Sequence, residues 1–188
     1  MANFTSKAIK EATIELLEER PLSEITVKDI VEKCGINRNS FYYHYSDLPS
    51  LIDEMIEECA QGIIDKYPTV DSIGEFFDAI TGFAARNKRA VMHIFKSVNR
   101  EEFEGHLMRI SEYFVRNAIE NLVKSENLSI PEDNMNLMVG YHKCVCFGLI
   151  IEWLNNGMSE ELAKNMKKVL SLGKELIEEL AAKLQPKG

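Results

Sequence analysis

The chain has 188 residues, of which 45% are hydrophobic and 28% are charged. This length and composition allow a buried core in one or two domains and exclude wholesale disorder. The net charge is −8, so composition alone does not favour nucleic-acid binding. No apolar run reaches the roughly 18 residues of a membrane-spanning helix and no signal-peptide pattern begins the chain, so we expect a cytoplasmic protein with no membrane partner.

The four cysteines are too few and too scattered for a disulfide framework; they are Cys34, Cys59, Cys144 and Cys146. They form no C-x-x-C pair and no histidine cluster accompanies them, so we expect no metal site. The sequence also lacks a nucleophile elbow, a P-loop, a dinucleotide fingerprint and an H-E-x-x-H motif. We therefore expect a protein that is not an enzyme, with no catalytic residues and no cofactor.

Apolar residues recur at helical spacing along almost the whole chain, and no stretch alternates as a strand does. This pattern predicts an all-α fold of about nine helices. The first helix is expected at 4–20, because Pro21 closes it. After a short connection, Thr26 is expected to cap a helix over 27–34, which ends at Gly35.

A short helix capped by Asn37 is expected over 38–45, and Ser46 or Asp47 then caps a helix that continues to about residue 66. Two short helices joined by a tight glycine-containing turn form a helix-turn-helix, although a generic helical corner has the same pattern. The apolar residues of the two helices can be buried against the first helix; they are Val27, Ile30, Val31, Ile36 and Phe41, against Ile9, Leu16 and Leu17.

The segment TVKDIVEKCGINRNSFYYHY, at residues 26–45, resembles the DNA-binding signature of TetR-family regulators. It contains the T-x-x-x-I-x-x-x-x-G-I core and the S-F-Y-Y-H-Y ending in the expected register, and the likeness extends over about residues 4–60. The resemblance implies a three-helix DNA-binding domain at 1–48 and a helical ligand-sensing and dimerisation domain at 49–188. It also implies a homodimer that binds a pseudo-palindromic operator on double-stranded DNA.

The resemblance implies that residues 38–44 form a recognition helix that enters the major groove. Arg38 and Asn39 would contact base edges, and Tyr42 would contact phosphate or a thymine methyl group. Other residues expected at or near the DNA backbone are Lys7, Thr26, Lys28, Asn37, Ser40, Tyr43 and His44. Phe41 and Tyr45 are expected to be buried.

Two features depart from the family pattern. Residues 1–50 contain six Lys or Arg and eight Asp or Glu, a net charge of −2. Ser46, Asp47 and Leu48 stand where many members carry a lysine that reaches phosphate. We therefore expect few ionic phosphate contacts. The alternative function is a TetR-fold co-regulator that acts through protein partners without reading DNA itself.

Beyond residue 70, helices are expected at 72–87, 88–99, 101–126, 132–156 and 159–184. Large apolar residues on them either line a pocket for a small-molecule effector or fill the core; they are Phe76, Phe77, Ile80, Phe83, Met92, Phe95, Met108, Tyr113 and Phe114. The segment 147–158 resembles the penultimate helix of a subgroup of TetR-like sensor domains that includes regulators near dihydroxyacetone kinase operons.

The last two helices carry residues that fit either a dimer interface or a seam within one chain; they are Tyr141, Val145, Gly148, Leu149, Glu152, Met166, Val169, Leu170, Leu176, Ile177 and Leu180. The expected function is a repressor whose effector, bound between residues 70 and 155, moves the helix that begins near Asp47 and weakens operator binding. The sequence leaves open repression or activation, and the identity of effector and operator.

Overall fold

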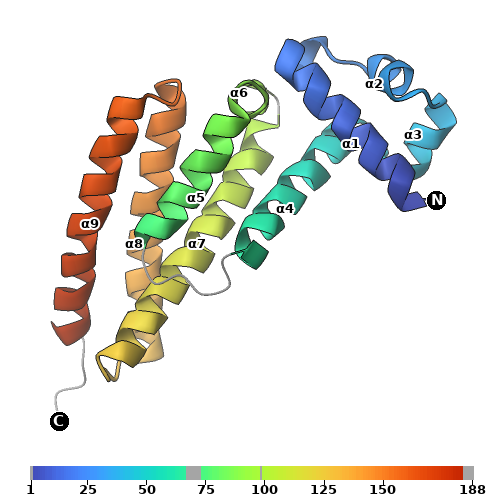
Figure 1. Ribbon diagram of the computed structural model, residues 1–188. Helices are drawn as coiled ribbons and strands as arrows, with labels where there is room; N and C mark the ends of the chain where they lie inside the picture. The colour runs from blue at the N-terminus through green and yellow to red at the C-terminus, as the bar shows by residue number, and fades with distance from the viewer. Residues whose placement is uncertain (1, 67–72, 98, 184–188) are drawn as a thin grey trace. The chain divides into compact units, whose positions relative to one another are not determined.

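The computed structural model describes residues 2–66, 73–97 and 99–183. Over these ranges the secondary structure consists of nine α-helices and one 3-10 helix, and none of these residues lies in a strand. The elements are α1 (Ala2–Glu19), η1 (Leu22–Glu24), α2 (Val27–Cys34), α3 (Arg38–His44), α4 (Leu48–Lys66), α5 (Ile73–Arg86), α6 (Lys88–Phe95), α7 (Arg100–Ser125), α8 (Glu132–Asn155) and α9 (Glu160–Lys183), as Figure 1 shows. The predicted all-α class is confirmed.

The residues form two compact units. The first unit comprises Met1–Cys59 and Arg86–His106, and the second comprises Ala60–Ala85 and Leu107–Gly188. Both α4 and α7 therefore contribute residues to both units. The division into domains at residue 48 stays a prediction, but the first unit includes α6, which packs on α1.

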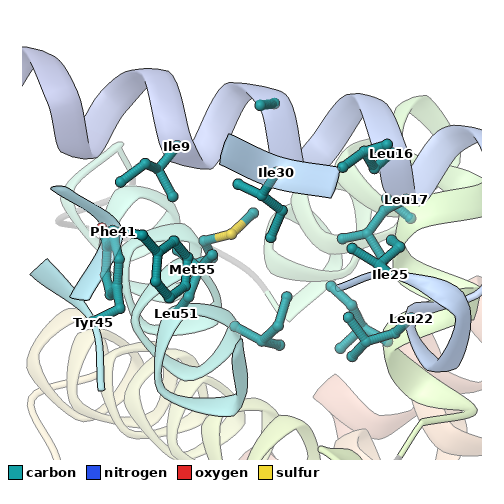
Figure 2. Packing of buried hydrophobic residues seen from close by; sticks show 14 of the residues in the cluster. Ile9, Leu16, Leu17, Leu22, Ile25, Ile30, Phe41, Tyr45, Leu51 and Met55 are labelled. Atoms are coloured by element: carbon teal, nitrogen blue, oxygen red, sulfur yellow. The ribbon is translucent and has the colours of Figure 1, made fainter. Parts of the chain in front are cut away.

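The core of the first unit is made by buried apolar side chains from six helical elements, α1, η1, α2, α3, α4 and α6, and from the connections between them. Figure 2 shows part of this cluster beneath α1; the labelled residues are Ile9, Leu16, Leu17, Leu22, Ile25, Ile30, Phe41, Tyr45, Leu51 and Met55. All ten are buried, and burial of each such side chain contributes about 1.5–3 kcal/mol to folding. Each element of the helix-turn-helix is thus fixed by its own apolar anchor.

The second unit is built from the end of α4, α5, most of α7, α8 and α9. α8 and α9 pack on each other and are joined by a tight turn, where Gly157 adopts a φ of +65°. The backbone N–H of Met158 donates to the Trp153 carbonyl at 2.9 Å, and the Trp153 indole N–H donates to the Ser159 carbonyl at 3.1 Å. This turn is therefore closed by one backbone hydrogen bond and one side-chain hydrogen bond.

One helix of the described ranges, α8, is long and apolar enough to cross a membrane by length and composition alone. Eight of its side chains are buried in the protein, among them Trp153 and His142. The core helix of a folded domain meets the same criterion, so this feature is weak support for a membrane span.

The predicted helix over 88–99 is wrong at its C-terminus, because α6 ends at Phe95. The Ser97 hydroxyl donates to the Ile94 carbonyl at 2.6 Å and accepts from the Asn99 N–H at 3.1 Å. Serine side chains that bond the local backbone in this way compete with the helical pattern. The sequence left Ser46 and Asp47 as alternative caps for α4. The cap is Asp47, whose carboxylate accepts from the Ser50 N–H at 2.8 Å.

Candidate nucleic-acid interface

The turn between α2 and α3 is fixed by a left-handed glycine. Gly35 has a φ of +69°, which costs a side-chain-bearing residue about 1–2 kcal/mol. The N–H groups of Gly35 and Ile36 both donate to the Val31 carbonyl, Ile36 at 3.0 Å. These bonds end α2 and turn the chain towards α3 within three residues.

α2 begins in a capping box formed by Thr26 and Asp29. The Thr26 hydroxyl accepts from the Asp29 N–H at 3.3 Å, and the Thr26 N–H donates to the Asp29 carboxylate at 2.8 Å. The Thr26 hydroxyl also donates to that carboxylate at 2.6 Å. The hydroxyl and the N–H of Thr26, a residue expected near the DNA backbone, thus both donate to Asp29 in this structure.

The Asp29 carboxylate is strongly stabilised in its charged form. Hydrogen bonds from the Thr26 hydroxyl and N–H, followed by one from Arg20 at 3.0 Å, lower the pKa of Asp29 to about 2. A carboxylate at a helix N-terminus is favoured by the helix dipole. This helix end therefore carries a negative charge at neutral pH.

α3 is capped by Asn37 and anchored by Phe41. The Asn37 side-chain oxygen accepts from the Ser40 N–H at 2.8 Å and from the Ser40 hydroxyl at 3.1 Å. Phe41 is fully buried, and Tyr45 is buried behind it with ring centroids 5.7 Å apart. The expectation that these two aromatic residues are buried is confirmed.

The outer face of α3 is exposed and rich in hydrogen-bonding side chains. Arg38 and Asn39 are exposed, as are Tyr42 at 53% and Tyr43 at 80% relative accessibility. The His44 ring is partly exposed and meets the Tyr43 ring edge to face at 5.1 Å. The structure thus brings the predicted base-contacting residues to one solvent-facing surface of a seven-residue helix.

Three cations of the first unit, Lys10, Arg20 and Lys33, are held in ion pairs with acids. Lys10 Nζ lies 2.7 Å from Glu54 Oε1 and 2.5 Å from Glu58 Oε1, and ties α1 to α4. Burial lowers the pKa of Lys10, but the hydrogen bonds to both carboxylates outweigh it and raise the pKa above its ordinary value. Lys33 pairs with Glu15 at 3.2 Å and Glu19 at 3.0 Å.

The two lysines predicted to flank the DNA are exposed. Lys7 and Lys28 make only loose pairs within their own helices, with Glu11 at 3.7 Å and Glu32 at 3.6 Å. Exposed pairs of this kind contribute about 0–1 kcal/mol and can exchange partners. Lys7 and Lys28 therefore keep the freedom to reach phosphate, whereas Lys10 and Lys33 are already bound to acids.

Sequence reasoning missed the role of α6 in this unit. The Glu18 carboxylate accepts from the Ala90 N–H at 3.3 Å, while Arg89 donates to the Glu18 carbonyl at 3.3 Å. The His93 Nδ1 atom lies 2.7 Å from the Leu17 carbonyl oxygen, to which it donates. The last carbonyls of a helix lack intrahelical partners, so α6 satisfies the end of α1. No sequence motif signals this contact.

The predicted pocket residues divide between the two units. Met92 and Phe95 belong to the first unit, with Phe95 in its interior. Those in the second unit are buried or partly buried; they are Phe77, Ile80, Phe83, Met108, Tyr113 and Phe114. The side chain of Phe76 lies outside the described residues.

The predicted interface residues on α8 and α9 also divide into two groups. The exposed ones are Tyr141, Gly148, Glu152, Val169 and Leu180, and Val145 and Leu149 are partly exposed. Met166, Leu170 and Ile177 are buried within the protomer. Leu137 and Leu172, which were not predicted, are 66% and 60% exposed. The side chain of Leu176 lies outside the described residues.

His142 of α8 is a buried polar residue that sequence reasoning passed over. It is 5% exposed, and its Nε2 atom has no hydrogen-bond partner within the described ranges. Burial lowers its pKa, which favours the neutral imidazole. Cys146 lies one turn further along α8 and is also buried; burial raises its pKa to about 12.

Comparisons with known proteins agree with the resemblance to TetR-family regulators. Residues 9–55 match the family described as bacterial regulatory proteins, tetR family, and residues 71–173 match the transcriptional regulator C-terminal region. The uncharacterized HTH-type transcriptional regulator YxbF of Bacillus subtilis (strain 168) is 24% identical over 163 residues, 82% of this chain. That alignment covers 41% of YxbF, so the chain spans about two-fifths of the length of this curated relative.

A solved structure, that of the dihydroxyacetone kinase operon activator DhaS, has a TM-score of 0.73 to this chain at 18% identity. The alignment covers 97% of this chain and 98% of DhaS, so the two proteins share a fold over their whole length. The match to the C-terminal region alone, residues 71–173, covers more than half of the 188 residues. These findings point to a regulator rather than an enzyme. The chain belongs to the TetR family of transcriptional regulators.

Proposed function

We propose that the protein is a cytoplasmic transcriptional repressor that binds a pseudo-palindromic operator as a homodimer and is released by a small-molecule effector. The observation that carries this proposal is the exposed face of α3, where Arg38, Asn39 and Tyr42 stand on a helix anchored by buried Phe41. An arginine can donate two hydrogen bonds to a guanine edge, and an asparagine can do the same with adenine through one donor and one acceptor. The Arg38 guanidinium has no ion-pair partner among the residues that the structure describes.

The proposed dimer uses the exposed apolar stripe of α8 and α9. On α8, Leu137, Tyr141 and Gly148 follow one another at intervals of four and seven residues, which places them on one helix face. Val169 and Leu172 of α9 are exposed as well. An exposed apolar face on paired helices suits a self-complementary two-fold interface. Such a dimer would present two recognition helices to major grooves about 34–36 Å apart.

We place the proposed effector site in the second unit, which contains buried aromatic residues and also the buried Nε2 atom of His142, for which the described residues offer no hydrogen-bond partner. A ligand group that forms a hydrogen bond with His142 Nε2 would satisfy this buried atom, as acceptor or donor according to the tautomer of the ring. Because α4 contributes to both units, an effector that displaces α4 would change the operator affinity. Effector and operator must then weaken each other's binding by the same factor.

The co-regulator remains a second candidate because of the charge distribution. Lys10 and Lys33 are held by acids, and Asp29 keeps a negative charge at the start of α2. A DNA-binding dimer in which these cations are unavailable to phosphate should show a shallow dependence of log Kd on log salt. A protein-binding surface would show no operator affinity at any salt concentration.

Selection from a randomised duplex library at low salt separates the two candidates. We expect enrichment of a palindrome by the wild type and by Arg86→Gln, which removes an exposed charge at the end of α5. Arg38→Gln and Tyr42→Ala should lose the enrichment while keeping the wild-type unfolding temperature. Absence of enrichment from folded dimer, both without effector and over a range of salt, would favour the co-regulator.

The dimer is tested separately by sedimentation. Tyr141→Glu places a charge in the proposed interface and should shift the protein towards monomer. Tyr43→Glu changes a tyrosine on α3 that is 80% exposed, against 59% for Tyr141, and should leave the dimer intact. A Tyr141→Glu protein that remains as dimeric as the wild type would exclude this face.

A further inference from the structure

The first unit contains a cavity of about 490 Å³ that lies apart from the face of α3. Its walls come from η1, the start of α4, α6 and the connection from α6 to α7; the residues used below are Leu22, Leu48, Pro49, His93, Lys96 and Asn99. This volume falls within the range of about 300–1,000 Å³ that is usual for small-molecule sites. All of these residues belong to one compact unit, so the cavity is formed within it.

Asn99, which is one of the residues that line this cavity, has an unsatisfied acceptor. Its residue is only 3% exposed, and its side-chain nitrogen donates to the Pro49 carbonyl at 3.4 Å. Its side-chain oxygen is buried and finds no hydrogen-bond partner among the residues that the structure describes. Buried polar atoms in folded proteins are nearly always bonded, so an unpartnered one in a cavity wall indicates a place for a ligand donor.

The rest of the lining combines apolar walls with polar groups. Leu22, Leu48 and Pro49 provide apolar surface, which would cover the body of a small molecule. The Lys96 side chain is exposed and has no ion pair within the described ranges. His93 donates through Nδ1 to the Leu17 carbonyl, so the neutral ring has Nε2 as an acceptor.

From these groups we infer that the cavity binds a small amphipathic carboxylic acid. Its apolar body would lie between Leu22 and Leu48, and its hydroxyl or amide N–H would donate to the Asn99 oxygen. Its carboxylate would pair with Lys96. This site is distinct from the effector site proposed in the second unit and does not depend on DNA binding by the protein.

The experiment follows backbone amide shifts of the full-length protein by NMR. The probes are 4-hydroxybenzoate, 4-hydroxyphenylacetate and 3-(4-hydroxyphenyl)propanoate, which share a phenol and a carboxylate at increasing separation. We expect saturable shifts at η1, the start of α4 and Lys96 with at least one of them. Phenylacetate is the second probe without its hydroxyl. It should bind about tenfold more weakly than that probe, because the Asn99 side-chain oxygen is then left unpartnered.

Matched variants assign the contacts. Asn99→Leu keeps the side-chain size and should weaken the hydroxylated acid about tenfold, but should bind phenylacetate as the wild type does. Lys96→Gln should weaken every acid about threefold, as expected for an exposed charge pair. Lys88→Gln, at the start of α6 and outside the cavity wall, should have no effect.

Two results would overturn the inference. The first is the absence of shifts at the cavity with all three acids up to about 10 mM. A dissociation constant above that concentration would be too weak for a useful small-molecule site. The second is binding that Asn99→Leu and Lys96→Gln leave unchanged. Ser23→Trp fills the cavity from exposed η1 and should abolish binding, and it serves as the test if Asn99→Leu does not fold.

Discussion

Lys10 joins α1 to α4 inside the first unit, and its removal gives the most direct test of how this unit is held together. Its Nζ lies 2.7 Å from Glu54 and 2.5 Å from Glu58, although 44 and 48 residues separate these partners in the sequence. The Lys10 side chain is 14% exposed. Lys10→Met keeps most of the apolar stem and removes the charge.

The expected loss of stability in Lys10→Met follows from the geometry of the two ion pairs. Coulomb's law with an effective dielectric constant of about 20 gives on the order of 5 kcal/mol for each pair at about 3 Å. Desolvation of Lys10 and the ordering of three long side chains cancel much of this, and the carboxylates remain 47% and 59% exposed to screening by salt. A net contribution of about 1.5–3 kcal/mol remains for the two charged hydrogen bonds together. Lys10→Met should reduce the free energy of unfolding by this amount.

The assay is urea unfolding at one fixed protein concentration, because dimerisation would make stability depend on concentration. Lys7→Met is the matched control: its partner Glu11 is 3.7 Å away and both side chains are exposed, so the loss should stay below about 0.5 kcal/mol. The difference between the two variants should shrink at high salt. Equal stability of Lys10→Met and Lys7→Met at low salt would refute the assigned role of Lys10.

Three further predictions concern the helix-turn-helix. Gly35→Ala should lower the free energy of unfolding by about 1 kcal/mol, because residue 35 has a φ of +69°. Gly105→Ala, in a helix with open space around it, should raise the free energy of unfolding by about 0.5 kcal/mol. Thermal unfolding of both variants checks this, and a change of the same sign in both would contradict it. Phe41→Ala should cost about 3–5 kcal/mol and abolish DNA binding through unfolding of the unit, and near-native stability would show that the aromatic anchor is dispensable. The stability advantage of the wild type over Asp29→Asn should be full above pH 3.8 and disappear as the pH falls towards about 2, because the pKa of Asp29 is lower in the folded than in the unfolded protein. Urea midpoints at a series of pH values measure this advantage. An advantage that grows as the pH falls would contradict the prediction.

Much of this protein followed from its sequence because its signals are local. Helical periodicity with caps predicted the helix at 27–34 as the structure has it, since Thr26 and Gly35 act only on their immediate neighbours. The short helix that follows was located by the same means, through Asn37 as its cap and Phe41 as its buried residue, whereas its recognition role was implied by the resemblance. The family resemblance, confirmed by the comparisons, rests on this short segment.

Contacts between distant segments were decided only by the tertiary structure. The sequence does not indicate a partner for Lys10, which only the approach of α4 commits to Glu54 and Glu58. The addition of α6 to the first unit and the cavity beside Asn99 depend on groups more than 70 and about 50 residues apart in sequence. Periodicity shows which face of a helix is apolar, but it does not show which helix covers that face. The partner is selected by packing and by the satisfaction of buried polar groups, both of which exist only once the chain has folded.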